Sequence, residues 1–155
     1  MTSLGMVAHE SGEAIARARA SLVSAVRAAA ASGMSQREIA KEIGRSQPEV
    51  SRLLRFHGTS PLGRRLRSAR SEVLRIVGEA GGSNVRVFGS LATGRDTPDS
   101  DVDLLFRTDE PMGLMGLSRL EQEISEAIGA SVDLVPDSNL RPFLRDRVLA
   151  EAVQL

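Results

Sequence analysis

The spacing of apolar residues changes near residue 80, and this change restricts the chain to a fold with a helical part and a mixed part. Before that point the apolar residues recur with the period of a helix. Beyond it, β-forming residues gather in short runs at 84–88, 101–106 and 131–135. We expect helices at about 11–31, 36–43, 47–56, 64–79, 114–128 and 140–154, after a loose tail over residues 1–10. The sequence therefore predicts an α+β protein with a small mixed sheet.

A breaker-rich segment, His57–Gly63, separates the two parts. We expect an all-α unit over residues 1–58, a linker over 59–63 and a second domain over 64–155. The charges differ across the chain as well: residues 1–80 hold 13 Lys/Arg against 7 Asp/Glu, and residues 81–155 hold 7 against 13. The first half can meet phosphate directly, whereas the second half needs a cation before it can do so.

Composition excludes several classes of protein. The chain has no Cys, which excludes a disulfide scaffold and any Cys-ligated zinc or iron–sulfur site. With four Phe and neither Trp nor Tyr, it has no aromatic platform for single-stranded nucleic acid. No apolar stretch is long enough to span a bilayer, and the N-terminus lacks the pattern of a signal peptide, so we expect a cytoplasmic protein.

Residues 35–55 have the pattern of two short capped helices joined by a tight turn. Ser35 with Glu38, and Ser46 with Glu49, are spaced as capping boxes, and Gly44 lies at the turn. This spacing is typical of a helix-turn-helix, although a helical hairpin that only packs has the same signals. The segment resembles the helix-turn-helix of small bacterial repressors and antitoxins. The candidate DNA-binding residues are the polar ones at the turn and on the second helix: Arg45, Ser46, Gln47, Ser51, Arg52 and Arg55.

The second part carries a Gly-Ser pair at the end of one predicted strand and acidic residues on two others. Gly89 and Ser90 can bring backbone N–H groups and a hydroxyl close to phosphate. Asp101 and Asp103 alternate along a strand, so both point to one face and suit a shared Mg²⁺ ion. Asp133 lies in an apolar run that predicts a buried strand, where a charge must be paired or bind metal.

Two other interpretations of the acidic residues explain the pattern less well. Asp99, Asp101, Asp103 and Glu110 match calcium-loop spacing, but Leu104 stands where an EF-hand needs glycine. A solvated acidic turn explains Asp99 but not acidic residues embedded in apolar runs.

The arrangement from Gly89-Ser90 through Asp101-x-Asp103 to Asp133 resembles that of the DNA polymerase beta-like nucleotidyltransferases, and the compact version resembles the minimal nucleotidyltransferases. Many of these are antitoxins paired with HEPN-type toxins. The resemblance implies that Gly89 and Ser90 hold the triphosphate, that Asp101 and Asp103 bind Mg²⁺, and that Asp133 completes the catalytic and metal site. Thr93 stands where relatives often have Arg, so Arg95 is the candidate for that charge.

These observations lead to one principal functional hypothesis. We expect Mg²⁺-dependent transfer of AMP from ATP to a protein partner, a HEPN-type toxin, by an antitoxin that also binds promoter DNA. Two-fold DNA sites usually require a dimer, so a homodimer is included in this hypothesis. The alternative is a transcriptional regulator whose nucleotidyltransferase domain only senses nucleotide or binds a partner. Transfer to a small molecule is disfavoured because the sequence offers no separate acceptor domain.

Overall fold

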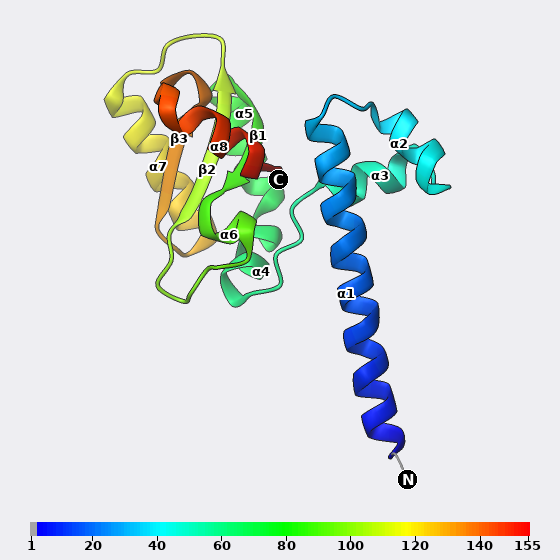
Figure 1. The fold of residues 1–155 in the computed structure, drawn as a ribbon. Coiled ribbons are helices and arrows are strands. Elements are labelled where there is room, and N and C mark those ends of the chain that lie inside the picture. Colours follow the sequence, from blue (N-terminus) through cyan, green and yellow to red (C-terminus); the bar gives the residue numbers. More distant parts are fainter. Residues whose placement is uncertain (1–2) are drawn as a thin grey trace. The chain divides into compact units, whose positions relative to one another are not determined.

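The computed structural model describes residues 3–155, which divide into two compact units between Leu54 and Arg55 (Figure 1). The sequence placed this boundary later, at the linker. The segment after Leu54 joins the second unit because Phe56 donates its backbone N–H to the Gln154 carbonyl at 2.7 Å. None of the helices described is long and apolar enough to cross a membrane.

The first unit consists of three helices, α1 (Leu4–Ala31), α2 (Gln36–Ile43) and α3 (Gln47–Leu54). The two short helices agree with the sequence, except that α3 ends two residues early. Their core is small and entirely apolar. It contains Val26 of α1, Ile39 and Ala40 of α2, and Val50 and Leu53 of α3.

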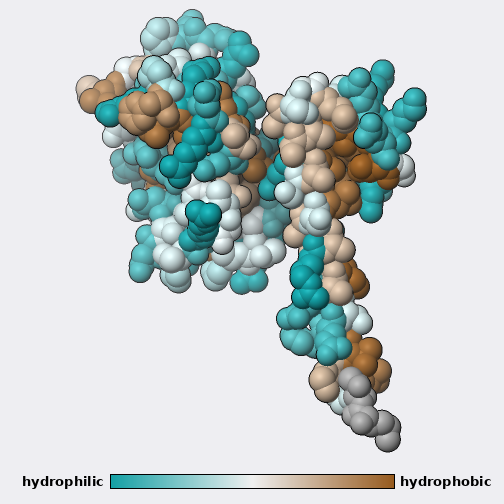
Figure 2. Space-filling view, viewed as in Figure 1, coloured by the Kyte–Doolittle hydropathy of each residue, from teal (hydrophilic) through white to brown (hydrophobic). Residues whose placement is uncertain are grey.

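The loose tail expected over residues 1–10 is wrong for the described residues, because α1 begins at Leu4. The Ser3 hydroxyl accepts the Met6 N–H at 3.2 Å and caps the helix. Glu13 then pairs along the helix with His9 and Arg17 at 3.4 and 3.6 Å. Every residue from 3 to 21 is exposed, and apolar side chains lie along this part of α1 (Figure 2). Caps, Ala-rich composition and ion pairs therefore sustain a helix that buries nothing here.

The second unit is built on a four-stranded mixed sheet in the order β3-β2-β1-β4. Strand β1 pairs antiparallel with β2 and β4, whereas β2 and β3 are parallel. The bounds of the strands are β1 Gly82–Phe88, β2 Val102–Thr108, β3 Val132–Pro136 and β4 Val153–Gln154. The observed fold is the α+β architecture that the sequence predicts, and its first three strands lie where they were expected.

The helices of this unit are α4 (Pro61–Ser68), α5 (Arg70–Glu79), α6 (Gly89–Thr93), α7 (Leu114–Ile128) and α8 (Pro142–Glu151), with a single 3₁₀ turn at Asp137–Asn139. Helices α5 and α7 contact each other and the sheet. Alternate residues of β2, namely Val102, Leu104 and Phe106, are fully buried in the core that these helices complete. Because side chains alternate along a strand, Asp103 points to the opposite face.

Three local predictions in this unit are wrong. The helix expected at 64–79 is two helices separated at Ala69, and the first begins at Pro61 because the Ser60 hydroxyl accepts the Gly63 N–H at 3.0 Å. The expected closing helix stops at Glu151, and the next residues form β4 at the sheet edge. Helix α6 was not expected at all.

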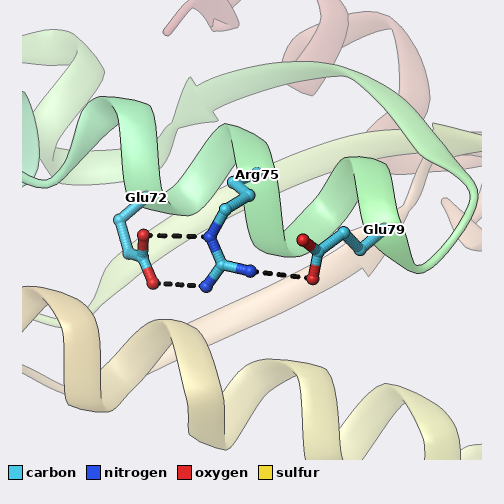
Figure 3. Close-up of polar contacts among 3 residues, drawn as sticks. All are labelled: Glu72, Arg75 and Glu79. Carbon is cyan, nitrogen blue, oxygen red and sulfur yellow. Dashed lines mark hydrogen bonds and ion pairs between the residues drawn. The ribbon is translucent and has the colours of Figure 1, made fainter.

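On the exposed side of α5, one arginine forms ion pairs with two glutamates of the same helix (Figure 3). Arg75 reaches back to Glu72 and forward to Glu79, with its bond to Glu79 measuring 2.8 Å. These carboxylates raise the pKa of the Arg75 guanidinium above its ordinary value. Such exposed pairs add little to stability, but they neutralise Arg75 locally.

Candidate active site

The turn after β1 brings Gly89 against Asp103. In the antiparallel register, Phe88 lies opposite Asp103. Gly89 has a φ of 69°, in the left-handed region, and a Cβ atom there would collide with the Asp103 carboxylate. Only glycine satisfies both the backbone conformation and this close approach. The sheet therefore places the Gly-Ser turn directly beside one of the predicted catalytic carboxylates.

Asp103 and Asp133 are neighbours in the parallel register of β2 and β3. Asp101 lies just before β2 and is exposed, as is Asp133, while Asp103 is partly buried. Burial, then the charge of Asp133, then that of Asp101 raise the pKa of Asp103 to about 6. The three predicted carboxylates therefore interact electrostatically, with Asp103 as the member that the other two affect.

The apolar neighbours of Asp133 predicted that its side chain would be buried. This prediction is wrong, because the side chain is exposed. Strand β3 lies at the edge of the sheet, and only its alternate residues, Val132, Leu134 and Pro136, are buried. The Glu121 carboxylate of α7 accepts the backbone N–H of Leu134 at 3.0 Å, which fixes this edge strand. Asp133 is thus held in position by its strand rather than by burial.

The residues after Gly89 form the short helix α6 instead of an open loop. The Thr93 hydroxyl donates to the Gly89 carbonyl at 3.1 Å, and the Arg95 N–H donates to the Ser90 carbonyl at 2.9 Å. Thr93 therefore has a structural role in closing this helical turn. Arg95 has an anchored backbone and an exposed side chain.

A pocket of about 260 Å³ lies beside Asp101, and its lining includes an arginine that the sequence did not indicate as a site residue. Arg65 lines it with Asp99 and Asp101, and its Nη1 donates to the Gly129 carbonyl at 3.1 Å. Nothing in the sequence separates Arg65 from its neighbouring arginines, because its place depends on how α4 packs.

The carboxylates fit magnesium by their donor chemistry. Within residues 3–155, no three His, Cys, Asp or Glu side chains are grouped closely enough to hold a metal ion. Mg²⁺, however, commonly takes only one or two protein carboxylates and completes its shell with water and phosphate. Asp101 and Asp103 fit that requirement, because their mutual repulsion is what a cation relieves. A calcium loop is excluded, because β2 runs through Val102–Thr108.

The candidate DNA-binding residues lie around the turn between α2 and α3. Both Ser/Glu capping pairs form, and Gly44 is left-handed with a φ of 67°. Arg45, Ser46, Gln47 and Arg52 are exposed, and Ser51 is partly buried. The Gln47 amide donates to the Gln36 side chain, which fixes the two helices to each other.

Arg55 does not lie on α3, where the sequence pattern predicted it. The helix ends at Leu54, and Arg55 makes a bridge to Gln154 in the second unit.

Comparison with known proteins assigns the second unit to a family. Residues 66–155 match the model of the nucleotidyltransferase domain. The chain belongs to the nucleotidyltransferase domain family. One similar protein comes from Methanocaldococcus jannaschii and is provisionally named a protein adenylyltransferase. It is 33% identical to this chain over 84 residues, which are 54% of this chain and 90% of that relative.

Two further comparisons agree with this assignment. The protein adenylyltransferase MntA of Thermococcus cleftensis is 38% identical to this nucleotidyltransferase over 69 residues, which are 44% of this chain and 70% of that relative. A solved structure described provisionally as a minimal nucleotidyltransferase superposes with a TM-score of 0.55 at 38% identity, covering 64% of this chain and all of that one.

Proposed function

We propose that this nucleotidyltransferase transfers AMP from ATP to a protein partner in an Mg²⁺-dependent reaction. The observation that carries the proposal is the position of Asp103, which lies against Gly89 and interacts with Asp101 and Asp133. Carboxylates that interact electrostatically, beside a turn without side-chain bulk, suit a metal-bound triphosphate. The relatives named as protein adenylyltransferases support AMP and protein as the transferred group and the acceptor.

The proposed roles follow from the chemistry of each group. Gly89, Ser90 and Arg95 hold the triphosphate, and Asp101 and Asp103 hold Mg²⁺, which neutralises the phosphate charge when bound. Asp133 completes the metal site and accepts the proton of the attacking hydroxyl. The acceptor oxygen forms a bond to the α-phosphorus as the bond to pyrophosphate breaks. Catalysis then rests on positioning and charge neutralisation.

The proposed partner is a HEPN-type toxin, and the protein would act as its antitoxin. This part of the proposal rests on the resemblance to minimal nucleotidyltransferases. The chain contains no tyrosine, so any AMP-tyrosine found in a mixture must lie on the partner.

The proposed role of residues 1–58 is to bind promoter DNA through a helix-turn-helix, with the protein as a homodimer on a two-fold site. The reciprocal caps and the left-handed Gly44 support this role because they fix a tight turn between two short helices. Arg45, Ser46, Gln47, Ser51 and Arg52 are the proposed contacts, and Arg55 is the proposed contact that lies beyond α3.

The test is a transfer assay with the product of the neighbouring gene. The full chain, Mg²⁺ and ATP labelled at the α-phosphate are incubated with and without that protein, and labelled residues are identified by mass spectrometry. We expect AMP on the partner only, and its loss with Asp103→Asn but not with the exposed control Asp146→Asn. A tight complex without labelling, in which ATP still binds, would refute transfer and favour the regulator hypothesis.

A further inference from the structure

The second unit contains an arginine-rich pocket that is separate from the candidate active site. Its volume is about 520 Å³, and its lining includes Arg55, Arg64, Arg67 and Arg70 together with His57; we call it the arginine pocket. None of these residues lines the pocket beside Asp101. The nucleotidyl transfer proposed above gives the arginine pocket no role, so its ligand must be inferred from the chemistry of its lining.

Among the residues that the structure describes, no Asp or Glu lines the arginine pocket. Residues 55–70 include five Arg and neither Asp nor Glu. In the part of the chain that the structure covers, Arg64, Arg67 and Arg70 enter no ion pair, whereas Arg75 on the same α4–α5 segment is held between two glutamates. Arg64, Arg67 and Arg70 are like charges around one pocket and repel one another, so an anionic ligand stabilises the pocket.

The frame of the pocket is fixed by the fold. Phe56 is 7% exposed and belongs to the core, and its backbone N–H donates a hydrogen bond to the Gln154 carbonyl. On α4, Leu62 and Leu66 are buried, which fixes the rotation of the helix about its axis. Arg64 and Arg67, three residues apart, therefore share one side of α4. The fold therefore places the Cα atoms of both arginines on one side of the helix before any ligand arrives.

We propose that the arginine pocket binds phosphate groups of the DNA backbone, which gives the catalytic unit its own contact with duplex DNA. One guanidinium group can donate two hydrogen bonds to the oxygens of one phosphate. Several guanidinium groups in one pocket therefore suit a polymer that presents phosphates at short intervals. Arg55 follows the last residue of α3 directly in the chain, so DNA bound by the first unit is at high effective concentration for this pocket. A backbone contact of this kind adds affinity without sequence preference.

The test measures binding of the full chain to a labelled duplex of arbitrary sequence, by fluorescence anisotropy at several salt concentrations. The variant is Arg64→Gln with Arg67→Gln. The matched control is Arg119→Gln with Arg141→Gln, which removes the same charge from exposed positions elsewhere. Circular dichroism melting checks that both variants fold.

The association constant K falls with salt, and loss of two phosphate contacts makes the negative slope of log K against log salt less steep by about 1.8. That change corresponds to about 30-fold weaker binding at 0.15 M salt. We expect this change in the pocket variant and not in the control. Equal slopes and affinities in the two variants would overturn the proposal. So would a pocket variant that keeps its DNA affinity but loses binding of inorganic tripolyphosphate or of a partner protein, because the pocket would then serve those anions.

A second background separates this proposal from the helix-turn-helix. In the Gln47→Ala, Arg52→Ala protein, the pocket substitutions should lower the salt slope by the same amount as in the parent chain. If Gln47→Ala, Arg52→Ala leaves promoter binding intact while the pocket variant loses affinity, the helix-turn-helix role fails and the arginine pocket stands. If the pocket substitutions have no effect in either background, the arginine pocket fails.

Discussion

The substitution Asp103→Asn should make the metal-free protein more stable at neutral pH, although it removes a residue proposed for catalysis. Burial and the neighbouring carboxylates raise the pKa of Asp103 from 3.8 to about 6. One pKa unit corresponds to about 1.4 kcal/mol, so the shift amounts to about 3 kcal/mol at most. Because water still reaches part of the carboxyl group, we expect an effect of about 2 kcal/mol on the free energy of unfolding.

The sign follows from which state holds the proton more tightly. Between about pH 4 and pH 6 the folded protein keeps the Asp103 proton, whereas the unfolded chain has begun to release it. The contribution to stability is therefore complete below the unfolded pKa and is lost as the pH rises through the folded value of about 6. The amide introduced by Asp103→Asn cannot ionise, so the variant is spared this loss.

The measurement is the free energy of unfolding in urea between pH 4 and pH 8, without divalent metal. We expect the two proteins to be similar at pH 4 and the variant to gain about 2 kcal/mol over the parent by pH 8. Asp146→Asn, an exposed control on α8, should follow the parent at each pH. Millimolar Mg²⁺ should then stabilise the parent more than Asp103→Asn.

Parallel pH profiles for the parent and Asp103→Asn, together with equal responses to Mg²⁺, would refute the reasoning. That result would mean that Asp103 is solvated like an ordinary surface carboxylate.

Three other predictions concern the fold. Gly89→Ala should cost about 2–3 kcal/mol, more than Gly94→Ala, because both glycines have positive φ but only Gly89 lies against another side chain; thermal melting compares them. Ser35→Ala removes the hydroxyl that accepts the Glu38 N–H and should destabilise the first unit by about 1 kcal/mol, measured by amide hydrogen exchange in α2 and α3. Leu66→Ala should destabilise the second unit by about 3 kcal/mol in urea, because the side chain is fully buried, and a cost below about 1 kcal/mol would contradict the packing described.

The local parts of the candidate site could be predicted because they depend on short-range patterns. Alternation along β2 indicates which side chains share a face, and the Gly-Ser pair after a β-forming run marks the turn. The contact between Gly89 and Asp103 comes from pairing of β1 with β2, and the proximity of Asp133 comes from the parallel register of β3. Registers between distant segments are not encoded in any single window of sequence.

The errors share a physical cause, which is that neighbours in the chain do not report the tertiary surroundings. Apolar residues on both sides of Asp133 suggested burial, but an edge strand covered on one face has the same sequence. The break at Ala69 has no Gly or Pro to mark it. Strand β4 has only two residues and exists because β1 offers them a partner.

The distribution of charge changes meaning once the structural boundary is known. The sequence places the excess of basic residues in the first 80 residues, which suggested that the DNA-binding unit carries it. The first unit ends at Leu54 and holds 7 Lys/Arg against 5 Asp/Glu, so most of that excess belongs to the second unit. Within residues 55–80 the arginines differ in their surroundings. Arg65 lines the pocket beside Asp101, Arg75 is neutralised on α5, and the other four, Arg55, Arg64, Arg67 and Arg70, line the arginine pocket. The excess of basic residues therefore lies mainly in residues 55–80, which hold six Arg against two Glu at the start of the catalytic unit, where a phosphate ligand outside the acidic site can use it.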